Sequence, residues 1–444
     1  MSSAKRILVI GAGPKGIALA AKAHALDDAG QQVPEVYLLD HQGSGANWTG
    51  NYGYTDGGQT LATSPVKDVG FPYRSRCWGN PELNREINFK MLACSWQAFL
   101  VDDKGEATRQ FADWVDRGLP YPSLAQWAEY LEWVRKVAKI TVHKQEVFGI
   151  DVRNGKWILQ VEDPVTRLLH VAPPGDALVV TGPGPAKLVE GYEGPTELVT
   201  DAQHLWDSGI INRIPHDARV GVIGDGGAAS SVILALLEEV GSGCEIVVIS
   251  QSGVTYTRGE SYDENRHYSD ADYWAWLDSQ SRKRFIRHTS RGVFPVHAKG
   301  QLNDAENLST VSGDVKGIVE IGNQVQIFYH DPEPDEDGFV PPKRDDEFFD
   351  FVVVAIGFDE LWWTRKLSTN AENEITAHTK NGKLDFPSVS YKIGEHLEVD
   401  GLSPRLHLPM LAGDRQGPGF PSLGCLGLLS DRILSLYCGA TPDK

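Results

Sequence analysis

RILVIGAGPKGIALAAKAHAL, residues 6–26, joins an apolar run of strand length to a segment with the apolar periodicity of a helix. The turn between them, GAGPKG, holds Gly11, Gly13 and Gly16 in the GxGxxG spacing, with Pro14 at the start of the helix. Glycines at these places allow a tight turn, close approach of the backbone to a diphosphate, and close packing of helix on strand. The stretch therefore predicts a dinucleotide site whose diphosphate lies at the helix N-terminus.

A second predicted strand supports this site. VYLLD, residues 36–40, follows the helix and ends in Asp40. A carboxylate at the end of that strand suits the ribose hydroxyls of FAD or NAD. A GxGxxG spacing alone is a weak signal, but here the strand, the helix, the second strand and the terminal acid all agree.

A second glycine turn lies in the middle of the chain. ARVGVIGDGGAASSVILALLEEV, residues 218–240, again leads from an apolar strand to a helix. Its turn holds Gly224, Gly226 and Ala229 in GxGxxA spacing. This predicts a second dinucleotide site in the same chain.

The strand after this second turn points to the identity of its ligand. EIVVIS, residues 245–250, ends in Ser250, and Ser252 and Arg258 follow it. A missing carboxylate removes repulsion against a 2′-phosphate, and serine together with arginine can bind one. The pattern favours NADPH over NADH.

Two such turns in one chain predict an α/β flavoprotein with two dinucleotide-binding (Rossmann-like) domains, the NADPH domain being inserted into the FAD domain. The apolar strands with glycine turns at 176–184 and 350–359 are the expected crossings between the domains. The predicted FAD domain comprises residues 1–210 and is completed by 355–444, which adds a small substrate-binding loop. The predicted NADPH domain comprises residues 211–354.

Composition excludes several classes of protein. A formal net charge of −18 over 444 residues argues against nucleic acid as a partner. No apolar run approaches the ~18 residues of a membrane span, and the first strand begins too early for a signal peptide, so a cytoplasmic protein is expected. The 5 cysteines are scattered, which predicts free thiols, no metal site and no disulfide reductase. The oligomeric state stays open, a homo-oligomer included.

One long segment resembles a particular family. GANWTGNYGYTDGGQTLATSPVKDVGFPYRS, residues 45–75, is similar to the siderophore lysine and ornithine N-hydroxylases, most of all to the mycobactin/nocobactin-type lysine enzymes. The similarity continues through 95–100, 257–265 and 416–434. Other flavin monooxygenases carry FxGxxxH before the second glycine turn, whereas this chain has only His204 of that pattern.

The resemblance assigns residues to the substrate end of the site. It implies that Lys67 binds the substrate carboxylate and that Asn265 contacts substrate and nicotinamide, while Ser290 stands where the family has a second asparagine. The C-terminal loop contributes Leu423 and Gly424. The residues alone favour the other interpretation, in which Lys67 is an ordinary surface charge, exposed or paired with its neighbour Asp68.

The resemblance also assigns residues to the cofactors. Trp48 is expected to flank the flavin, although Thr49 replaces a frequent histidine and Ala62 falls where ornithine enzymes have a glutamine. Gly413 is counted among the FAD-binding residues. No acid–base residue is expected to be catalytic, because the chemistry depends on positioning.

The implied reaction is N-hydroxylation of the side-chain amine of L-lysine for hydroxamate siderophores. In this family NADPH reduces FAD, molecular oxygen forms a flavin hydroperoxide, and retained NADP⁺ shields it from water. Two alternatives stay open. One is a monooxygenase acting on ornithine or another substrate, and the other is an NADPH-binding flavoprotein, a sensor or an oxidase, that hydroxylates nothing.

Overall fold

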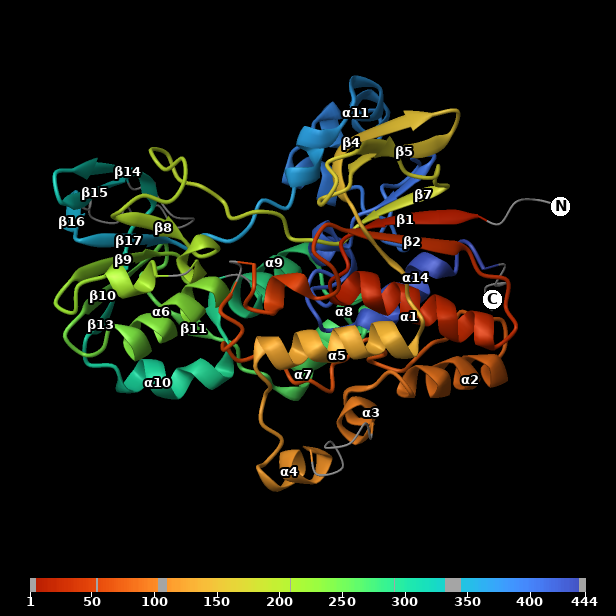
Figure 1. Cartoon of the computed structure of the whole chain (residues 1–444), viewed down its shortest axis with the longest axis horizontal. Helices are drawn as coiled ribbons and strands as arrows, with labels where there is room; N and C mark the ends of the chain where they lie inside the picture. The colour runs from red at the N-terminus through yellow and green to blue at the C-terminus, as the bar shows by residue number, and fades with distance from the viewer. Residues whose placement is uncertain are drawn as a thin grey trace.

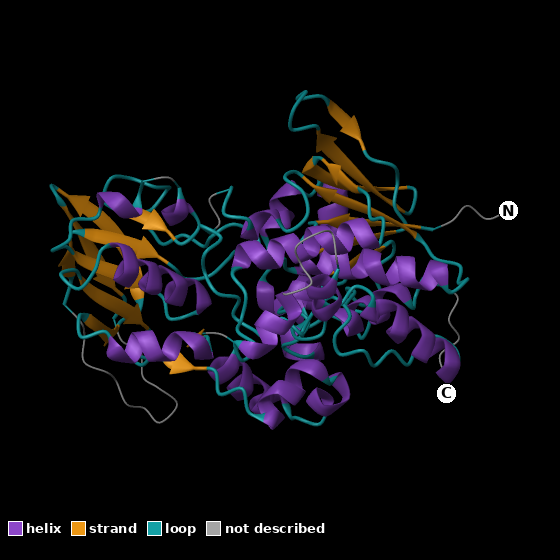
Figure 2. Cartoon of the chain, turned by 60° about the horizontal axis from the view of Figure 1, so that its bottom comes forward, coloured by secondary structure: helices purple, strands orange, loops and turns teal. Residues whose placement is uncertain are grey.

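The computed structural model describes residues 5–52, 55–102, 110–207, 209–290, 292–331 and 345–438. Two α/β units lie next to each other, and two chain segments connect them (Figure 1). Helices fill the middle of the molecule between the strands of the two units (Figure 2). None of the described helices is long and apolar enough to cross a membrane.

The first unit is built on a five-stranded parallel sheet of order β18-β7-β1-β2-β3. Its strands are β1 (Arg6–Ile10), β2 (Glu35–Asp40), β3 (Val142–Lys144), β7 (Ala177–Val180) and β18 (Arg405–His407). A three-stranded antiparallel sheet adjoins it, formed by β4 (Glu146–Arg153), β5 (Lys156–Glu162) and β6 (Leu169–Val171). Strands β1 and β7 are apolar runs because both faces of the parallel sheet are covered.

Helices surround this sheet. They are α1 (Pro14–Asp28), α2 (Pro81–Leu92), α3 (Trp96–Val101), α4 (Gln110–Asp116), α5 (Leu124–Val137), α11 (Thr369–Thr376), α12 (Phe386–Ser390), α13 (Gly413–Gln416) and α14 (Leu426–Leu434). One buried apolar cluster joins α1, α5 and α14 to the sheet. The two ends of the chain thus share one core, as the predicted completion by the C-terminal segment requires.

The second unit repeats the plan with a parallel sheet of order β13-β10-β9-β17-β8. Its strands are β8 (Val199–Asp201), β9 (Arg219–Ile223), β10 (Glu245–Ser250), β13 (Leu308–Ser312) and β17 (Phe351–Val354). An antiparallel sheet of β14 (Val315–Ile321), β15 (Gln324–Tyr329) and β16 (Glu347–Phe349) and a short pair, β11 (Tyr256–Thr257) with β12 (Val293–Phe294), complete its strands. Its helices are α6 (Gly227–Glu239), α7 (Tyr262–Ser269), α8 (Ala271–Ala275), α9 (Ser279–Thr289) and α10 (Lys299–Asp304).

The two connecting segments run side by side. Ala186 and Phe358 form an antiparallel bridge. Next to it the Lys187 amide donates to the Gly357 carbonyl at 2.9 Å, and the Asp359 amide donates to the Pro185 carbonyl at 2.8 Å. The chain therefore pairs with itself directly after the first crossing expected at 176–184 and at the end of the second, expected at 350–359. The predicted two-unit α/β fold with an inserted second unit is confirmed.

The predicted boundary at residue 210 needs correction. Strand β8 pairs with β17, so the second sheet already has a strand at Val199–Asp201. In the other direction, α7 to α9 reach back to the first unit. A side chain at Gly419 would meet the Tyr268 carbonyl oxygen at 1.9 Å, so the C-terminal loop lies directly against the end of α7.

Candidate active site

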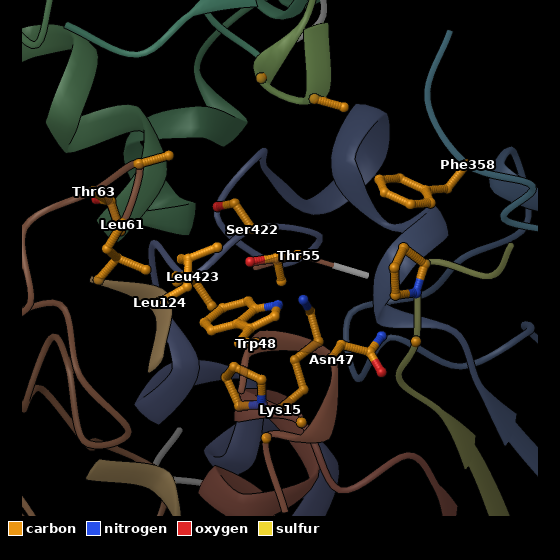
Figure 3. A pocket seen from close by; sticks show the side chains of 18 of the residues that line it. Lys15, Asn47, Trp48, Thr55, Leu61, Thr63, Leu124, Phe358, Ser422 and Leu423 are labelled. Carbon is orange, nitrogen blue, oxygen red and sulfur yellow. The ribbon is translucent and has the colours of Figure 1, made fainter. Parts of the chain in front are cut away.

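A cavity of about 530 Å³ lies where β1, the start of α1, the segment after Gly45 and the C-terminal loop meet (Figure 3). It extends from the first glycine turn to the first turn of α6 in the second unit. Its lining comprises Gly11, Gly13, Pro14, Lys15, Asp40, Gly45, Ala46, Asn47, Trp48, Thr55, Gln59, Leu61, Ala62, Thr63, Lys67, Leu124, Thr181, Gly182, Pro183, Ala202, Gln203, Trp206, Gly227, Ala228, Ser231, Arg258, Tyr268, Phe358, Met410, Pro421, Ser422, Leu423 and Gly424.

The first glycine turn uses each glycine differently. Gly11 has φ +106°, and a Cβ there would lie 2.5 Å from the Thr181 hydroxyl. A Cβ on Gly16 would lie 2.2 Å from the Gly11 carbonyl oxygen, so this glycine allows the helix to pack against the turn. A Cβ on Gly13, the N-cap of α1, would meet nothing within 4 Å. The open space beside the free N–H groups of the helix is what a diphosphate needs.

Asp40 holds the first turn in place. One carboxylate oxygen accepts from the Ala12 amide at 2.9 Å, and the other accepts from the Gln42 and Gly43 amides, both at 2.9 Å. Asp40 also lines the cavity, as expected for a ribose-binding acid.

The second turn has the same backbone plan. Gly224 has φ +122°, and a Cβ there would lie 2.4 Å from the Ala355 carbonyl oxygen. Gly226 is the N-cap of α6 with open space around it, and Ala229 is fully buried against the sheet. Gly227 and Ala228, in the first turn of α6, line the cavity, so the N-terminal ends of α1 and α6 face one site.

The three residues expected to bind a 2′-phosphate, Ser250, Ser252 and Arg258, do not bond one another as a single group in the structure. The Ser250 hydroxyl donates to an Asp225 carboxylate oxygen at 2.5 Å and contacts the Ser252 hydroxyl at 2.9 Å. Arg258 instead donates from Nε to the Thr289 carbonyl at 3.0 Å, and its guanidinium lies over the Tyr268 ring. The structure adds two points: the hydrogen bonds of Arg258 are to Thr289 and Tyr268 rather than to the serines, and a carboxylate, Asp225, does stand beside this strand end.

The substrate end of the cavity brings together two residues that are 198 positions apart in the chain. Lys67 Nζ donates to Asn265 Oδ1 at 2.6 Å, and Asn265 Nδ2 donates to the Glu260 carbonyl at 2.9 Å. Burial lowers the pKa of Lys67 below its usual range, and the charges of Glu260 and Glu264 oppose that shift. An anionic ligand group here would meet a partly buried, oriented ammonium.

Asp68 does not pair with Lys67. It is fully buried, and its carboxylate accepts from the Tyr73 hydroxyl at 2.7 Å, the Trp96 amide at 2.9 Å and the Gly70 amide at 3.0 Å. Burial raises the pKa of Asp68 to about 6. The surface-pair interpretation is therefore wrong, because Asp68 anchors the loop that presents Lys67 to the cavity.

The other expected residues divide into two groups. Trp48, Ala62, Leu423 and Gly424 line the cavity. Ser290 caps the C-terminus of α9 and Gly413 begins α13, and neither belongs to the lining. Their assigned roles are not supported by this arrangement.

Sequence reasoning missed several lining residues, chiefly Lys15, Asn47, Gln59 and Tyr268. Gln59 stands near Ala62, the position at which the resemblance lacked a glutamine, and hydrogen-bonds the Thr55 hydroxyl. Lys15 was visible as the one charged residue of GAGPKG. Its side chain runs between Trp48 and Asn47 into the cavity (Figure 3).

Comparison with known proteins decides the family. L-lysine N6-monooxygenase MbtG of Mycolicibacterium paratuberculosis is 35% identical over 435 residues, which cover 98% of this chain and 96% of that protein. MbtG of Mycobacterium tuberculosis H37Rv is 36% identical over 428 residues, covering 96% and 94%. The chain belongs to the L-lysine N6-monooxygenase family. No protein-family model matches it.

A solved structure supports membership in the L-lysine N6-monooxygenase family. Lysine monooxygenase NbtG from Nocardia farcinica superposes with a TM-score of 0.82 at 33% identity, covering 99% of this chain and 100% of that one. The structure of NbtG was described as having an unprecedented NADPH domain conformation. The family resemblance inferred from residues 45–75 is confirmed, and with it the assignment to the flavin- and NADPH-dependent monooxygenases.

Proposed function

We propose that this protein hydroxylates the side-chain N6 amine of L-lysine, with FAD and NADPH as cofactors and molecular oxygen as co-substrate. The observation that carries the proposal is the Lys67–Asn265 contact at one end of a cavity that the first glycine turn and the start of α6 both line. The family relationship directs this geometry to lysine. The pathway we propose is hydroxamate siderophore biosynthesis in the cytoplasm, and a homo-oligomer is compatible with it.

Lys67 gives the site its selectivity for an amino acid. Its ammonium is partly buried and bonded to a neutral amide oxygen, and no carboxylate of the described residues forms an ion pair with it, so a substrate carboxylate would supply a direct partner. An amine without a carboxylate leaves that cation unpaired, which weakens its binding. Asn265 holds the ammonium in place through Oδ1.

The opposite requirement applies to the amine that reacts. An ammonium has no lone pair, so the substrate nitrogen must be neutral, and its usual pKa is about 10.4. Leu61, Leu124 and Leu423 line the cavity and provide an apolar surface (Figure 3). Removing the amine from water there lowers its pKa and favours the neutral form.

The described residues fit the two nucleotides. The open spaces at Gly13 and Gly226 suit a diphosphate at the start of α1 and of α6 respectively. Asp40, Trp48 and Leu423 line the same cavity, and in this proposal Asp40 would bind the FAD ribose while Trp48 and Leu423 would contact the ring. When bound, FAD supplies the redox and oxygen chemistry, while this chain binds, orients and excludes water.

The test is product analysis by mass spectrometry after incubation with NADPH and an equimolar mixture of L-lysine, L-ornithine and cadaverine. N6-hydroxylysine should dominate. Ornithine differs by one methylene, worth ~1–3 kcal/mol in a pocket, so some N5-hydroxyornithine is tolerable. If hydroxylated cadaverine dominates, or if only peroxide forms, the proposal is wrong.

A variant isolates the carboxylate contact. Lys67→Met should raise the KM for lysine roughly 100-fold, because losing one partner of a buried charge pair costs ~2–5 kcal/mol. Cadaverine turnover and NADPH-driven flavin reduction should change little. Lys283→Met, at an exposed lysine of α9, is the matched control. An unchanged KM for lysine in Lys67→Met would remove Lys67 from the substrate site.

A further inference from the structure

Lys15 is a buried cation in the cofactor half of the cavity. It occupies the first turn of α1, is 8% exposed, and donates from Nζ to the Pro421 carbonyl at 2.8 Å. Figure 3 shows its ammonium at the open middle of the cavity beside Trp48. The side chain thus links the first glycine turn to the C-terminal loop.

The same helix holds a second buried lysine that makes a useful comparison. Lys22 is 1% exposed, but its Nζ forms an ion pair with Asp431 at 2.8 Å and contacts the Ser75 hydroxyl at 2.9 Å. Among the described residues no carboxylate makes such an ion pair with Lys15. Lys22 is therefore a charge neutralised within the fold, and Lys15 is one that the fold leaves unneutralised.

An unneutralised cation at this place is unfavourable for the protein by itself. Burial of an unpaired charge costs free energy, and the N-terminus of a helix carries positive partial charge that repels a cation. In agreement, burial lowers the pKa of Lys15 to about 8. Groups that oppose folding in this way are typical of sites that a ligand completes.

We propose that Lys15 is the cationic contact of the bound flavin cofactor, its ammonium neutralising an anionic group of FAD. This rests on the proposed function only in that the cavity holds FAD. Two anionic groups have the required chemistry: the diphosphate, which is charged in both redox states, and the ring system, which becomes anionic only when reduced. Either group could accept from the N–H groups of Lys15 that are not bonded to Pro421.

The surroundings of Lys15 allow a clean pH test. The Cys425 thiol is the titratable group that acts on it most directly, and burial raises the pKa of that thiol to about 12, so it stays neutral below pH 9. Asp40 is held by three backbone amides, and Asp431 is neutralised by Lys22. In the cofactor-free protein Lys15 loses its proton above about pH 8, and an anion bound to it raises its pKa. Binding therefore takes up a proton, and affinity for FAD falls as pH rises above 8.

The experiment titrates the full-length, cofactor-stripped protein with FAD at pH 6.5 to 9 and measures its thermal unfolding. In Lys15→Met we expect the unfolding temperature without FAD to rise or stay unchanged. With the diphosphate as the partner, the Kd for oxidised FAD should rise roughly 10- to 100-fold and the decline in affinity above pH 8 should vanish. With the ring as the partner, these changes should concern reduced FAD only. In Lys22→Met, which leaves Asp431 buried and unpaired, the unfolding temperature without FAD should fall. Lys15→Gln, neutral but able to donate to Pro421, serves if Lys15→Met fails to fold.

The outcomes separate the two hypotheses and the two anions. A wild-type protein that does not bind FAD contradicts the proposed function, whereas equal affinity for oxidised FAD in wild type and both Lys15 variants, together with an unchanged potential of the bound flavin, overturns the Lys15 inference alone. Destabilisation of the cofactor-free protein by both Lys15 variants would make Lys15 structural and also overturn it. If the diphosphate is the partner, the potential of the bound flavin is unchanged. If the reduced ring is the partner, the potential falls by ~30 mV for each tenfold selective loss of reduced-state affinity.

Discussion

In each unit one carboxylate connects the glycine turn to the end of the neighbouring strand. The two units differ in which of these two segments carries the acid. In the first unit the acid is at the strand end, where Asp40 accepts from the Ala12 amide of the turn. In the second unit the acid is in the turn, where Asp225 accepts from the Ser250 hydroxyl at the strand end. The backbone is otherwise matched, since Gly11 and Gly224 donate to Leu39 and Ile249 at 2.8 and 2.9 Å.

Two turns with the same backbone conformation can therefore be held by different side-chain contacts, so that the two nucleotide sites differ in chemistry. Asp40 is bound by three backbone amides and is fixed by the fold. The Asp225 contact depends on one hydroxyl, so this acid is held more weakly. A residue at the end of the second strand therefore does not by itself determine which nucleotide binds.

The largest difference in stability is expected at the last small residue of each turn, which is Gly16 in the first unit and Ala229 in the second. Gly16→Ala places a Cβ 2.2 Å from the Gly11 carbonyl oxygen, and backbone cannot move away cheaply. We expect a loss of about 3 kcal/mol in unfolding free energy and loss of retained flavin. Ala229 already carries a Cβ at the equivalent place of the second unit, so Ala229→Gly should cost about 1–2 kcal/mol, mainly from helix propensity and a lost buried methyl.

Chemical denaturation of both variants with and without FAD checks this expectation. Equal losses would mean that the two turns pack with the same tolerance, contrary to the Cβ contacts. Gly13→Ala is the internal control, because its Cβ meets nothing within 4 Å in the protein. It should fold normally and weaken FAD binding only, since the added methyl enters the space we assign to the diphosphate.

The acids provide a second, smaller contrast. Asp40→Ala frees three backbone amides, which we expect to cost about 2–4 kcal/mol in stability and to weaken FAD binding at least tenfold. Asp225→Ala frees one hydroxyl and should cost about 1 kcal/mol or less. Thermal unfolding and FAD titration measure both, with exposed Asp27→Ala as control. A costlier Asp225→Ala would reverse the proposed order of the two contacts.

The sequence predicted the parts of the site that local backbone geometry dictates. Gly11, Gly16 and Gly224 lie where a side chain would overlap another atom, and their spacing between an apolar strand and a helix indicated the turns. The two crossings between the units followed from two apolar strands with glycine turns. The meeting of Lys67 and Asn265, in contrast, was available only through the family resemblance, because nothing in their spacing brings them together.

The incorrect predictions concern residues whose position is set by contacts with segments far away in the sequence. Arg258 follows β10 in the chain, but its hydrogen-bond partners are the Thr289 carbonyl and the Tyr268 hydroxyl. It comes directly after β11, and the pairing of β11 with β12 directs it toward the cavity. Strand β8 has three residues, too few for an apolar run to be recognised. Lys15 was not predicted as a site residue, because a lysine in a glycine-rich turn is expected to be exposed to solvent unless the structure shows that it is buried.

The smallest expected effect concerns the choice of nicotinamide nucleotide. If the ribose of NADPH lies at the end of β10, the Asp225 carboxylate repels a 2′-phosphate there, and Asp225→Asn should remove about 1 kcal/mol of that repulsion. We therefore expect the ratio of kcat/KM for NADPH over NADH to rise about fivefold, with the exposed Glu239→Gln of α6 as control. The rise should shrink at high salt, because screening weakens the same repulsion in the wild type. An unchanged ratio at low salt would mean that Asp225 does not act on the nucleotide. Its role would then be to connect the second turn to the strand end, a structural role that Asp40 also has in the first unit.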